Sequence, residues 1–205
     1  MGAEAKCTAR VKGRTDVGTA RLETEVLQFR GRELRLSIPF KAMKRVEAVD
    51  GELRVTSSDA SVALELGAAA AKWADKIKHP PSRLQKLGVK PEWRVSAVGV
   101  DDEVFLSELE GAVAVLTIGR IRKPSDAIFF GANREAQLGR LEQLKASIER
   151  NGAIWVIRPK GRKEISEAAV MAAGKAAGLV DVKVVSFSPT HTAEKFVIPI
   201  KNRPR

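Results

Sequence analysis

Basic side chains gather in two short runs in the second half of the chain. The first run holds Arg120, Arg122 and Lys123, and the second holds Arg158, Lys160, Gly161, Arg162 and Lys163. Guanidinium and ammonium groups donate hydrogen bonds to phosphate and carboxylate oxygens, and a glycine lets a loop approach a ligand closely. Each run follows a predicted strand, so both are expected at the carboxyl edge of a parallel sheet, where open α/β folds bind ligands.

We therefore predict a candidate anion-binding edge formed by these eight residues. His191 and Lys195 lie near the start of the last predicted strand and are predicted as accessory residues of the same edge. The alternative is that both runs are solvated loops that keep a basic protein soluble.

Side chains suited to catalysis or metal binding are sparse. His79 and His191 lie far apart, and Cys7 is the single cysteine, so the sequence shows no metal-ligand spacing and no intramolecular disulfide. His191 follows hydroxyl residues and could act as a general base, but no acid partner is identifiable. We predict no catalytic residue, no bound metal and no cofactor, which favours a non-catalytic protein.

The turn over residues 97–103, AVGVDDE, contains one glycine and three acids. Nucleotide-binding and S-adenosylmethionine folds usually have a glycine-rich turn at this place, because backbone amides must approach the cofactor. Neither GxGxxG nor GxxxxGK[ST] occurs in the chain. The acids are suited instead to the N-terminus of a helix, where they cap it and complement its dipole.

The chain of 205 residues has 36 Lys and Arg against 25 Asp and Glu, a formal net charge of +11. This excess keeps nucleic acid open as a partner. The sequence shows neither a run of about 20 apolar residues nor a secretory signal, so we expect a soluble cytoplasmic protein and no integral membrane insertion.

The elements that must position these residues fall into two predicted domains, residues 1–81 and 82–205, separated at Pro80-Pro81. Alternating apolar and polar residues predict strands over 8–11, 18–23, 26–30, 33–38, 53–56 and 61–66, with a hairpin at Asp50-Gly51. A helix is predicted over 68–79. This order suits an antiparallel β-barrel capped by one helix.

The second domain alternates strands and helices, which predicts an α/β domain with a mostly parallel sheet and an antiparallel last strand. The fold class is therefore α+β overall. Strands are predicted over 94–98, 113–118, 127–130, 153–157, 182–187 and 195–200, and helices over 83–87, 101–110, 134–150 and 167–177. Ser82, Asn133 and Ser166 are predicted helix caps. Only about eight residues join the strands at 113–118 and 127–130, so a parallel connection there would be a taut and unusual crossover, because such connections normally need a dozen or more residues.

Two resemblances accompany these patterns. The segments GTARLETEVLQFRG, LRLSIPFKAMKRVEAVDGELRVT and VALELGAAAAKWADKIKHPP resemble bacterial pleckstrin-homology-like domains over about residues 6–80. The segments NGAIWVIRPKGRKEIS and GLVDVKVVSFSPTHTAEKFV resemble a bacterial domain family of unknown function over about residues 84–200. The second half is also similar, in its order of elements, to the later part of Rossmann-like methyltransferases, including the final antiparallel hairpin.

Three functional hypotheses follow. The first is a bacterial two-domain binding or regulatory protein that contacts a protein partner through the pleckstrin-homology-like domain and a small anionic ligand at the α/β edge. The second is a divergent methyltransferase-like enzyme, which the order of elements implies. The third is non-specific nucleic-acid binding, which the net charge suggests.

Overall fold

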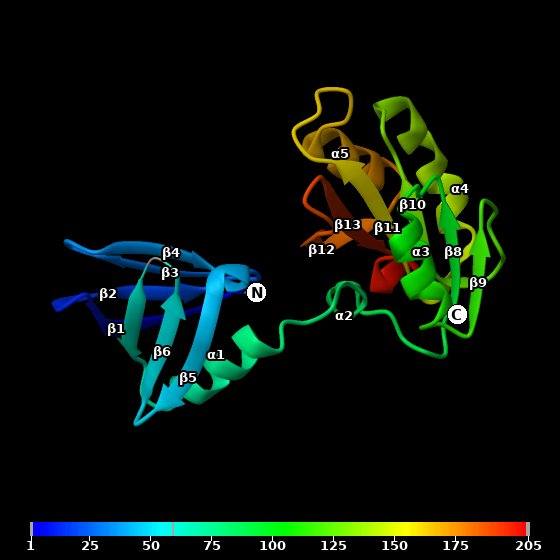
Figure 1. Cartoon of the computed structure of the whole chain (residues 1–205). Helices are drawn as coiled ribbons and strands as arrows, with labels where there is room; N and C mark the ends of the chain where they lie inside the picture. Colours follow the sequence, from blue (N-terminus) through cyan, green and yellow to red (C-terminus); the bar gives the residue numbers. More distant parts are fainter. Residues whose placement is uncertain (1, 59, 204–205) are drawn as a thin grey trace. The chain divides into compact units, whose positions relative to one another are not determined.

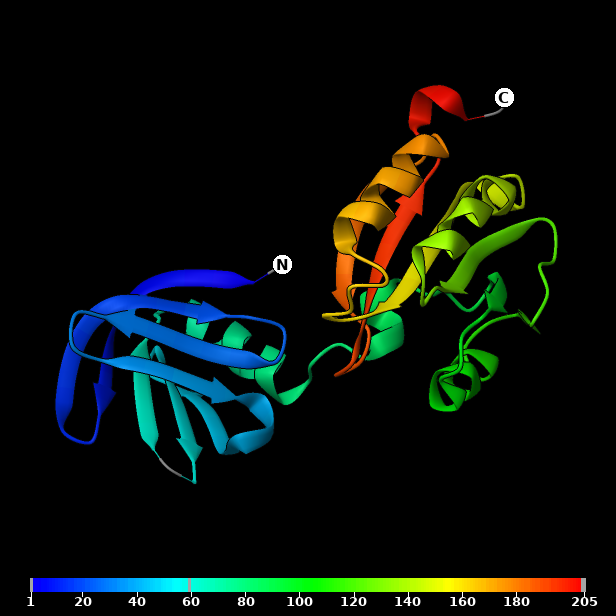
Figure 2. The same cartoon turned by 90° about the horizontal axis from the view of Figure 1, so that it is seen from above.

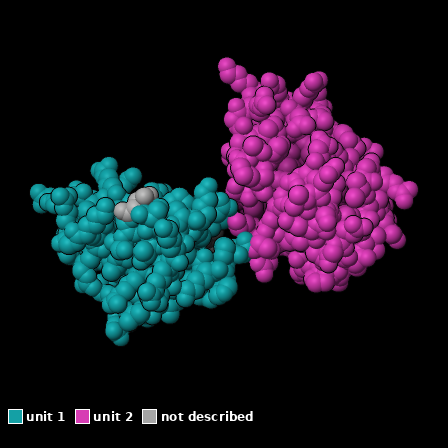
Figure 3. Space-filling model, in the orientation of Figure 1, with its two compact units in different colours: residues 1–81 teal, residues 82–205 magenta. Residues whose placement is uncertain are grey.

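The computed structural model describes residues 2–58 and 60–203. The chain forms two compact units, residues 1–81 and 82–205 (Figure 3), and each is described by itself. Among the described residues, no helix has the length and apolar character needed to cross a membrane.

Unit 1 is one antiparallel sheet of seven strands in the order β4-β3-β2-β1-β7-β6-β5 (Figures 1 and 2). The antiparallel sheet expected from the sequence is present, and it curls into a half-barrel with β4 and β5 as its two edges (Figure 1). The strands are β1 (Ala3–Val11), β2 (Arg14–Leu22), β3 (Val26–Gly31), β4 (Arg35–Pro39), β5 (Met43–Val49), β6 (Glu52–Ser57) and β7 (Ser61–Glu65), followed by the helix α1 (Ala69–Lys78).

Two tight hairpins set the register of this sheet. Lys12 and Gly13 join β1 to β2, and Asp50 and Gly51 join β5 to β6, with positive φ at all four residues. Positive φ at both central residues is the geometry of a type I′ turn, whose twist matches that of the flanking strands. The hairpin predicted at Asp50-Gly51 is confirmed.

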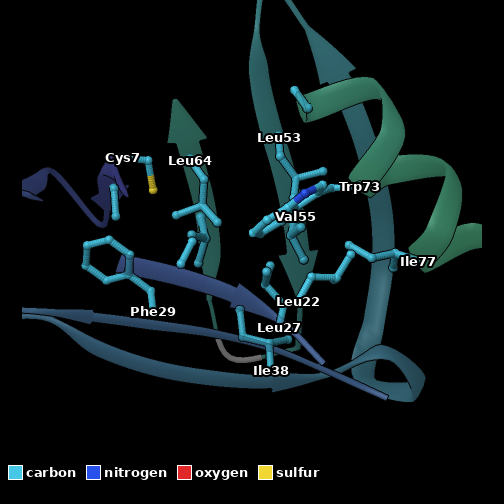
Figure 4. Packing of buried hydrophobic residues seen from close by; sticks show 14 of the residues in the cluster. Cys7, Leu22, Leu27, Phe29, Ile38, Leu53, Val55, Leu64, Trp73 and Ile77 are labelled. Carbon is cyan, nitrogen blue, oxygen red and sulfur yellow. The ribbon is translucent and has the colours of Figure 1, made fainter. Parts of the chain in front are cut away.

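The core of unit 1 lies between the concave side of the half-barrel and α1 (Figure 4). Leu53, Val55 and Leu64 point from the strands toward Trp73 and Ile77 of the helix, and all five are buried. Alternate strand residues therefore face inward, and the residues between them face solvent. This alternation leaves mainly polar side chains, with Val17 as an exposed apolar one, on the outer face of β1 to β4.

Unit 2 is built on a six-stranded mixed sheet in the order β12-β13-β11-β10-β8-β9. The strands β9, β8, β10 and β11 are parallel, and β13 and β12 complete the sheet in antiparallel pairing. The elements are α2 (Arg83–Leu87), β8 (Arg94–Val98), α3 (Glu103–Glu110), β9 (Val115–Ile118), β10 (Ser125–Gly131), α4 (Leu141–Lys145), β11 (Ile148–Pro159), α5 (Glu167–Ala176), β12 (Val180–Ser186) and β13 (His191–Val197).

The taut crossover expected between two of these strands is present. Residues 119–124 lead from the end of β9 to the start of β10 without a helix, and β8 lies between the two strands. The backbone amide of Arg122 donates to the Ser96 hydroxyl of β8 at 3.0 Å, and that hydroxyl lies 2.9 Å from the Ser125 hydroxyl. These hydrogen bonds hold the short connection against the sheet.

One predicted helix is wrong. In place of the helix expected over residues 134–150, the structure has a 3₁₀ segment, Glu135–Arg140, followed by the short helix α4, which ends at Lys145. Gly139 interrupts the helical run, and Ile148 already pairs with Ser125 as the first residue of β11. Asn133 is not the cap, because Arg134 holds the N-cap position, whereas Ser82 and Ser166 cap α2 and α5 as predicted.

Two apolar cores lie on the two faces of this sheet. One face packs against α4 and α5 through residues such as Phe130, Leu144 and Val170. The other packs against α3 and the loop after β12 through Phe105, Phe129, Trp155 and Phe187. Both faces are therefore covered, and the open part of the sheet is its edge at the carboxyl ends of the parallel strands.

Candidate functional site

A cleft of about 440 Å³ opens at the carboxyl edge of the parallel strands of unit 2. Three segments form it: the turn between β8 and α3, the ends of β10 and β11, and the loop between β12 and β13. The lining residues are Gly99, Val100, Asp101, Asp102, Gly131, Asn133, Ile157, Phe187, Ser188, Pro189, Thr190 and His191. The place is the one where open α/β folds hold ligands, between the strands at which the sheet order reverses.

One wall of this cleft is acidic. Asp102 caps α3 by accepting a hydrogen bond from the amide of Phe105 at 2.8 Å, and Asp101 precedes it as an exposed carboxylate. Burial raises the pKa of Asp102, but the Phe105 amide and the Arg83 guanidinium together outweigh it, so the pKa lies below its ordinary value. Asp102 is therefore a carboxylate at neutral pH.

Arg83 of α2 fixes the acidic wall to the loop on the other side of the cleft. Its guanidinium lies 2.6 Å from the Asp102 carboxylate and 3.0 Å from Glu108. The same group stacks over two rings, 4.9 Å from the centroid of Phe105 and 5.0 Å from that of Phe187. A cation between two aromatic faces and two carboxylates holds its neighbours in one arrangement, so the cleft has a rigid frame.

The opposite wall carries His191 in a loop held by hydroxyl groups. The Nδ1 atom of His191 lies 2.9 Å from the Thr190 hydroxyl, and its backbone amide donates to the Ser188 hydroxyl at 3.0 Å. His191 and Asp102 both line the cleft. Within the described residues no carboxylate hydrogen-bonds to the imidazole, and a nucleophile–base–acid relay is not formed.

Two glycines meet at the floor of the cleft. A Cβ atom on Gly131 would overlap the carbonyl oxygen of Gly99, and a Cβ on Gly99 would lie 2.8 Å from the carbonyl oxygen of Gly131. Gly99 also has a φ of +67°, which disfavours any other residue. The backbones at the ends of β8 and β10 are therefore in close contact at the floor of the cleft, and neither glycine can be replaced without a clash.

The predicted basic residues lie outside the cleft. Arg120, Arg122 and Lys123 are exposed and follow β9, and the hydrogen bond from the Arg122 amide to Ser96 shows that this segment already runs back along the sheet. Strands β8 and β10 separate β9 from β11, a distance of about 14 Å at the usual strand spacing. The structure does not bring the two basic runs together.

The second run is divided between buried and exposed positions. Arg158 is buried and pairs with Glu194, with its Nη2 2.8 Å from Oε1, and it lies 3.6 Å from Glu167. Burial raises the pKa of the Glu194 carboxyl, and the attraction of Arg158 opposes this shift. Lys160 donates to the Ser186 hydroxyl and the Ser188 carbonyl, whereas Gly161, Arg162 and Lys163 form an exposed turn.

Lys195 lies in the middle of β13, because that strand begins at His191 and not at Lys195 as expected. Its ammonium group lies 5.7 Å from the centroid of the Trp155 ring. Burial, Lys183 and Lys90 lower the pKa of Lys195. It is four residues from the sheet edge and does not join His191 at the cleft.

The residues that form the cleft include several that sequence reasoning assigned only to the fold. Asp101 and Asp102 were expected as helix-capping acids, and Asp102 does cap α3. The signal that could have found the cleft is their position directly after a parallel strand, which is also the position of ligand-binding residues. No group of three His, Cys, Asp or Glu side chains suited to a metal ion occurs in the part of the chain that the structure describes.

No family model and no curated protein matches this sequence. Solved structures with some similarity of fold include a S-adenosylmethionine-dependent methyltransferase from Aquifex aeolicus, with 19% identity, 57% of this chain and 87% of that chain covered, and a TM-score of 0.41. A methyltransferase from Pyrococcus furiosus has 13% identity, 56% and 78% coverage and a TM-score of 0.40. The N-terminal PH domain of human ARAP2 has 10% identity, 38% and 73% coverage and a TM-score of 0.29. We take no function from similarities of this size.

Proposed function

We propose that unit 2 is a binding module that holds a small molecule carrying a positive charge in the cleft at the carboxyl edge of its sheet. The acidic wall carries this proposal. Asp102 is already paired with Arg83, while Asp101 forms no ion pair within the described residues and is exposed at the cleft. A carboxylate without a partner beside a cavity is suited to an ammonium, guanidinium or sulfonium group.

The remaining lining supports a small organic ligand. Ile157 and Phe187 offer apolar surface, and Asn133, Ser188 and Thr190 offer hydrogen-bonding groups. A volume of about 440 Å³ lies within the range of roughly 300–1,000 Å³ usual for such sites. Binding without catalysis is favoured because His191 has a hydroxyl partner and, within the described residues, no hydrogen-bonded acid.

Few of the basic residues predicted to bind an anion are available beside the cleft. Arg158 forms an ion pair with Glu194, and the basic run after β9 is separated from β11 by two strands. The exposed turn with Arg162 and Lys163 is therefore the part that can bind an anion near the cleft. The amide of Lys160 donates to the Thr190 carbonyl at 2.8 Å, so this turn begins beside the wall of the cleft. We propose that an anionic group on the same ligand is received there.

A second candidate function is methyl transfer with S-adenosylmethionine. One feature favours it: the cleft lies between β8 and β10, where the strand order reverses, and that cofactor carries both a sulfonium and an ammonium group. The contact between Gly99 and Gly131 and the absence of a glycine-rich turn oppose it.

For unit 1 we propose a pleckstrin-homology-like fold, supported by seven antiparallel strands followed by α1.

Isothermal titration and thermal unfolding of the full chain test the proposal. The probes are arginine as a zwitterion with an extra cation, S-adenosylmethionine, and inorganic phosphate as an anion alone. We expect arginine or S-adenosylmethionine to bind and to raise the melting temperature, because a ligand of the native state stabilises it. Binding of phosphate alone, or of none of the three at millimolar concentration, would contradict a site for cations.

A matched pair of variants locates the site. Asp101→Asn removes one carboxylate from the cleft, and we expect about a tenfold loss of affinity for the cationic probe. Asp181→Asn removes the same charge at the start of β12, at the opposite edge of the sheet, and should leave affinity unchanged. Equal losses in both variants would indicate a general charge effect and not a site at Asp101. Binding of S-adenosylmethionine without binding of arginine is the outcome that would favour the second candidate function, methyl transfer.

A further inference from the structure

A second hollow, of about 400 Å³, lies on the outer face of β2, β3 and β4 in unit 1. Three arginines and several neutral hydrogen-bonding side chains line it, and none of the lining residues is acidic. The lining residues are Thr19, Arg21, Gln28, Phe29, Arg30, Arg35, Leu36 and Ser37.

The strand register places two of these arginines, Arg30 and Arg35, in one row across the sheet with Thr19 and Lys6. Lys6 of β1 faces Thr19 of β2, Thr19 faces Arg30 of β3, and Arg30 faces Arg35 of β4. All four belong to the solvent side of the sheet, since Cys7, Ala20 and Phe29, the neighbours of the first three, are buried and Arg35 is itself exposed. At the usual strand spacing, the row extends over about 14 Å, more than one phosphate group can occupy.

The next row on the same face adds hydrogen-bonding groups. Arg21 of β2 faces Glu4 of β1 on one side and Gln28 of β3 on the other, and Gln28 faces Ser37 of β4. Arg21 forms an ion pair with Glu4 at 2.7 Å. Glu4 is thus the acid of this row, and it lies at the end away from Arg30 and Arg35.

Arg30 and Arg35 are placed as an unfavourable pair. Like charges directly opposite each other on adjacent strands destabilise a sheet. Neither guanidinium forms an ion pair within residues 2–58 and 60–203. The fold gains nothing from two facing arginines, so their arrangement points to an anionic ligand that neutralises both.

We propose that this outer face of β1 to β4 binds the phosphate backbone of a nucleic acid without reading its sequence. A row of cations about 14 Å long fits successive phosphates better than a single small anion. Phe29, the aromatic residue of the hollow, is buried, so base stacking is not offered. Among its described residues this surface has one large exposed apolar side chain, Val17, which is less than a membrane-anchoring face requires. This inference is independent of the cleft in unit 2.

Fluorescence anisotropy of the full chain with a labelled oligonucleotide tests the proposal. A 12-nucleotide single strand and its duplex are titrated between about 50 and 200 mM salt. With Lys6, Arg30 and Arg35 on phosphates and Arg21 held by Glu4, log K should fall against log salt with a slope of about −2 for the single strand and about −3 for the duplex. The comparison of the two slopes and affinities identifies which form the face prefers.

The double variant Arg30→Gln/Arg35→Gln should weaken binding and reduce the slope for the single strand by about 1.4. Arg45→Gln/Arg54→Gln removes the same charge from β5 and β6, at the far end of the strand order, and should leave the slope unchanged. Absence of binding to either oligonucleotide overturns the proposal, as do equal losses in both variants. Equal binding of polyglutamate, or binding of vesicles containing phosphatidylserine without oligonucleotide binding, also overturns it.

Discussion

The contact between Gly99 and Gly131 makes a sharp prediction about the stability of unit 2. In Gly131→Ala, the new Cβ would lie 2.5 Å from the carbonyl carbon of Gly99 and 3.2 Å from the amide nitrogen of Val100, both backbone atoms. No side chain can rotate away to relieve this overlap. Carbon atoms in ordinary contact lie about 3.5 Å apart, so the ends of β8 and β10 would have to separate by at least about 1 Å.

The size of the effect follows from where this separation falls. Phe130, the residue before Gly131, pairs with Val98 in the parallel ladder of the central strands. Overpacking of a closely packed region costs about 1–3 kcal/mol, and a backbone clash belongs at the upper end. A loss of about 3 kcal/mol lowers the melting temperature of a domain of this size by about 10 °C.

Differential scanning calorimetry of the full chain measures this change. Tryptophan fluorescence in a Trp73→Phe background assigns the transition of unit 2, because the two remaining tryptophans, Trp93 and Trp155, both lie in that unit. Gly139→Ala is the matched control, because its Cβ would have open space around it, and it should change stability by less than about 1 kcal/mol. Gly131→Ala with the stability of the unsubstituted chain would refute the close approach of the two strand ends. Equal losses in both variants would refute the assignment of the loss to that contact.

Three other perturbations have defined outcomes. Arg35→Gln should raise the stability of unit 1 by about 0.2–1 kcal/mol at low salt, measured by urea unfolding, because it removes the repulsion from Arg30; an unchanged midpoint would contradict this. Glu194→Ala should lower the stability of unit 2 by about 3–5 kcal/mol, since it leaves the buried Arg158 guanidinium without its carboxylate, and a urea-midpoint loss below about 1 kcal/mol would count against a buried pair. The pKa of Asp102 is lower in the folded than in the unfolded chain, where it is about 3.9. The ionised Asp102 therefore contributes fully to the stability of unit 2 above that unfolded pKa, and this contribution is lost as the pH falls through the lower folded pKa. Acid unfolding monitored by circular dichroism should therefore depend less steeply on pH below about 4 in Asp102→Asn, and an identical profile would contradict it.

Local sequence signals predicted most elements of the fold. The Asp50-Gly51 turn, the caps at Ser82 and Ser166 and the strand over 94–98 depend on neighbours in the chain, and the structure agrees with them. The helix expected over 134–150 failed because the pairing of Ile148 with Ser125 is a long-range contact. That contact outweighs a helical stripe of leucines, and periodicity in the sequence does not contain it.

The sequence indicated where a binding site would lie in the sheet but did not reveal which residues line the cleft. The carboxyl edge of the parallel strands was the expected place, and the cleft does open there. The basic run after β11 was expected to line it, but the alternation of side chains along β11 places Arg158 on the face that packs against α5, where it pairs with the buried Glu194. Which loop residues line a cavity depends on partners far along the chain, such as Arg83 with Phe187, and spacing alone does not reveal them.

The position of β13 has a consequence for the order in which unit 2 can be completed during synthesis. This strand lies between β11 and β12, although it is made after both. Until residues 191–197 leave the ribosome, β11 has an unpaired edge that includes Ile154, Val156 and Ile157, and β12 has no strand to pair with. An exposed apolar edge of this kind favours aggregation. Nascent chains that stop before residue 191 would thus depend on chaperones, whereas unit 1 has all its strands by residue 65.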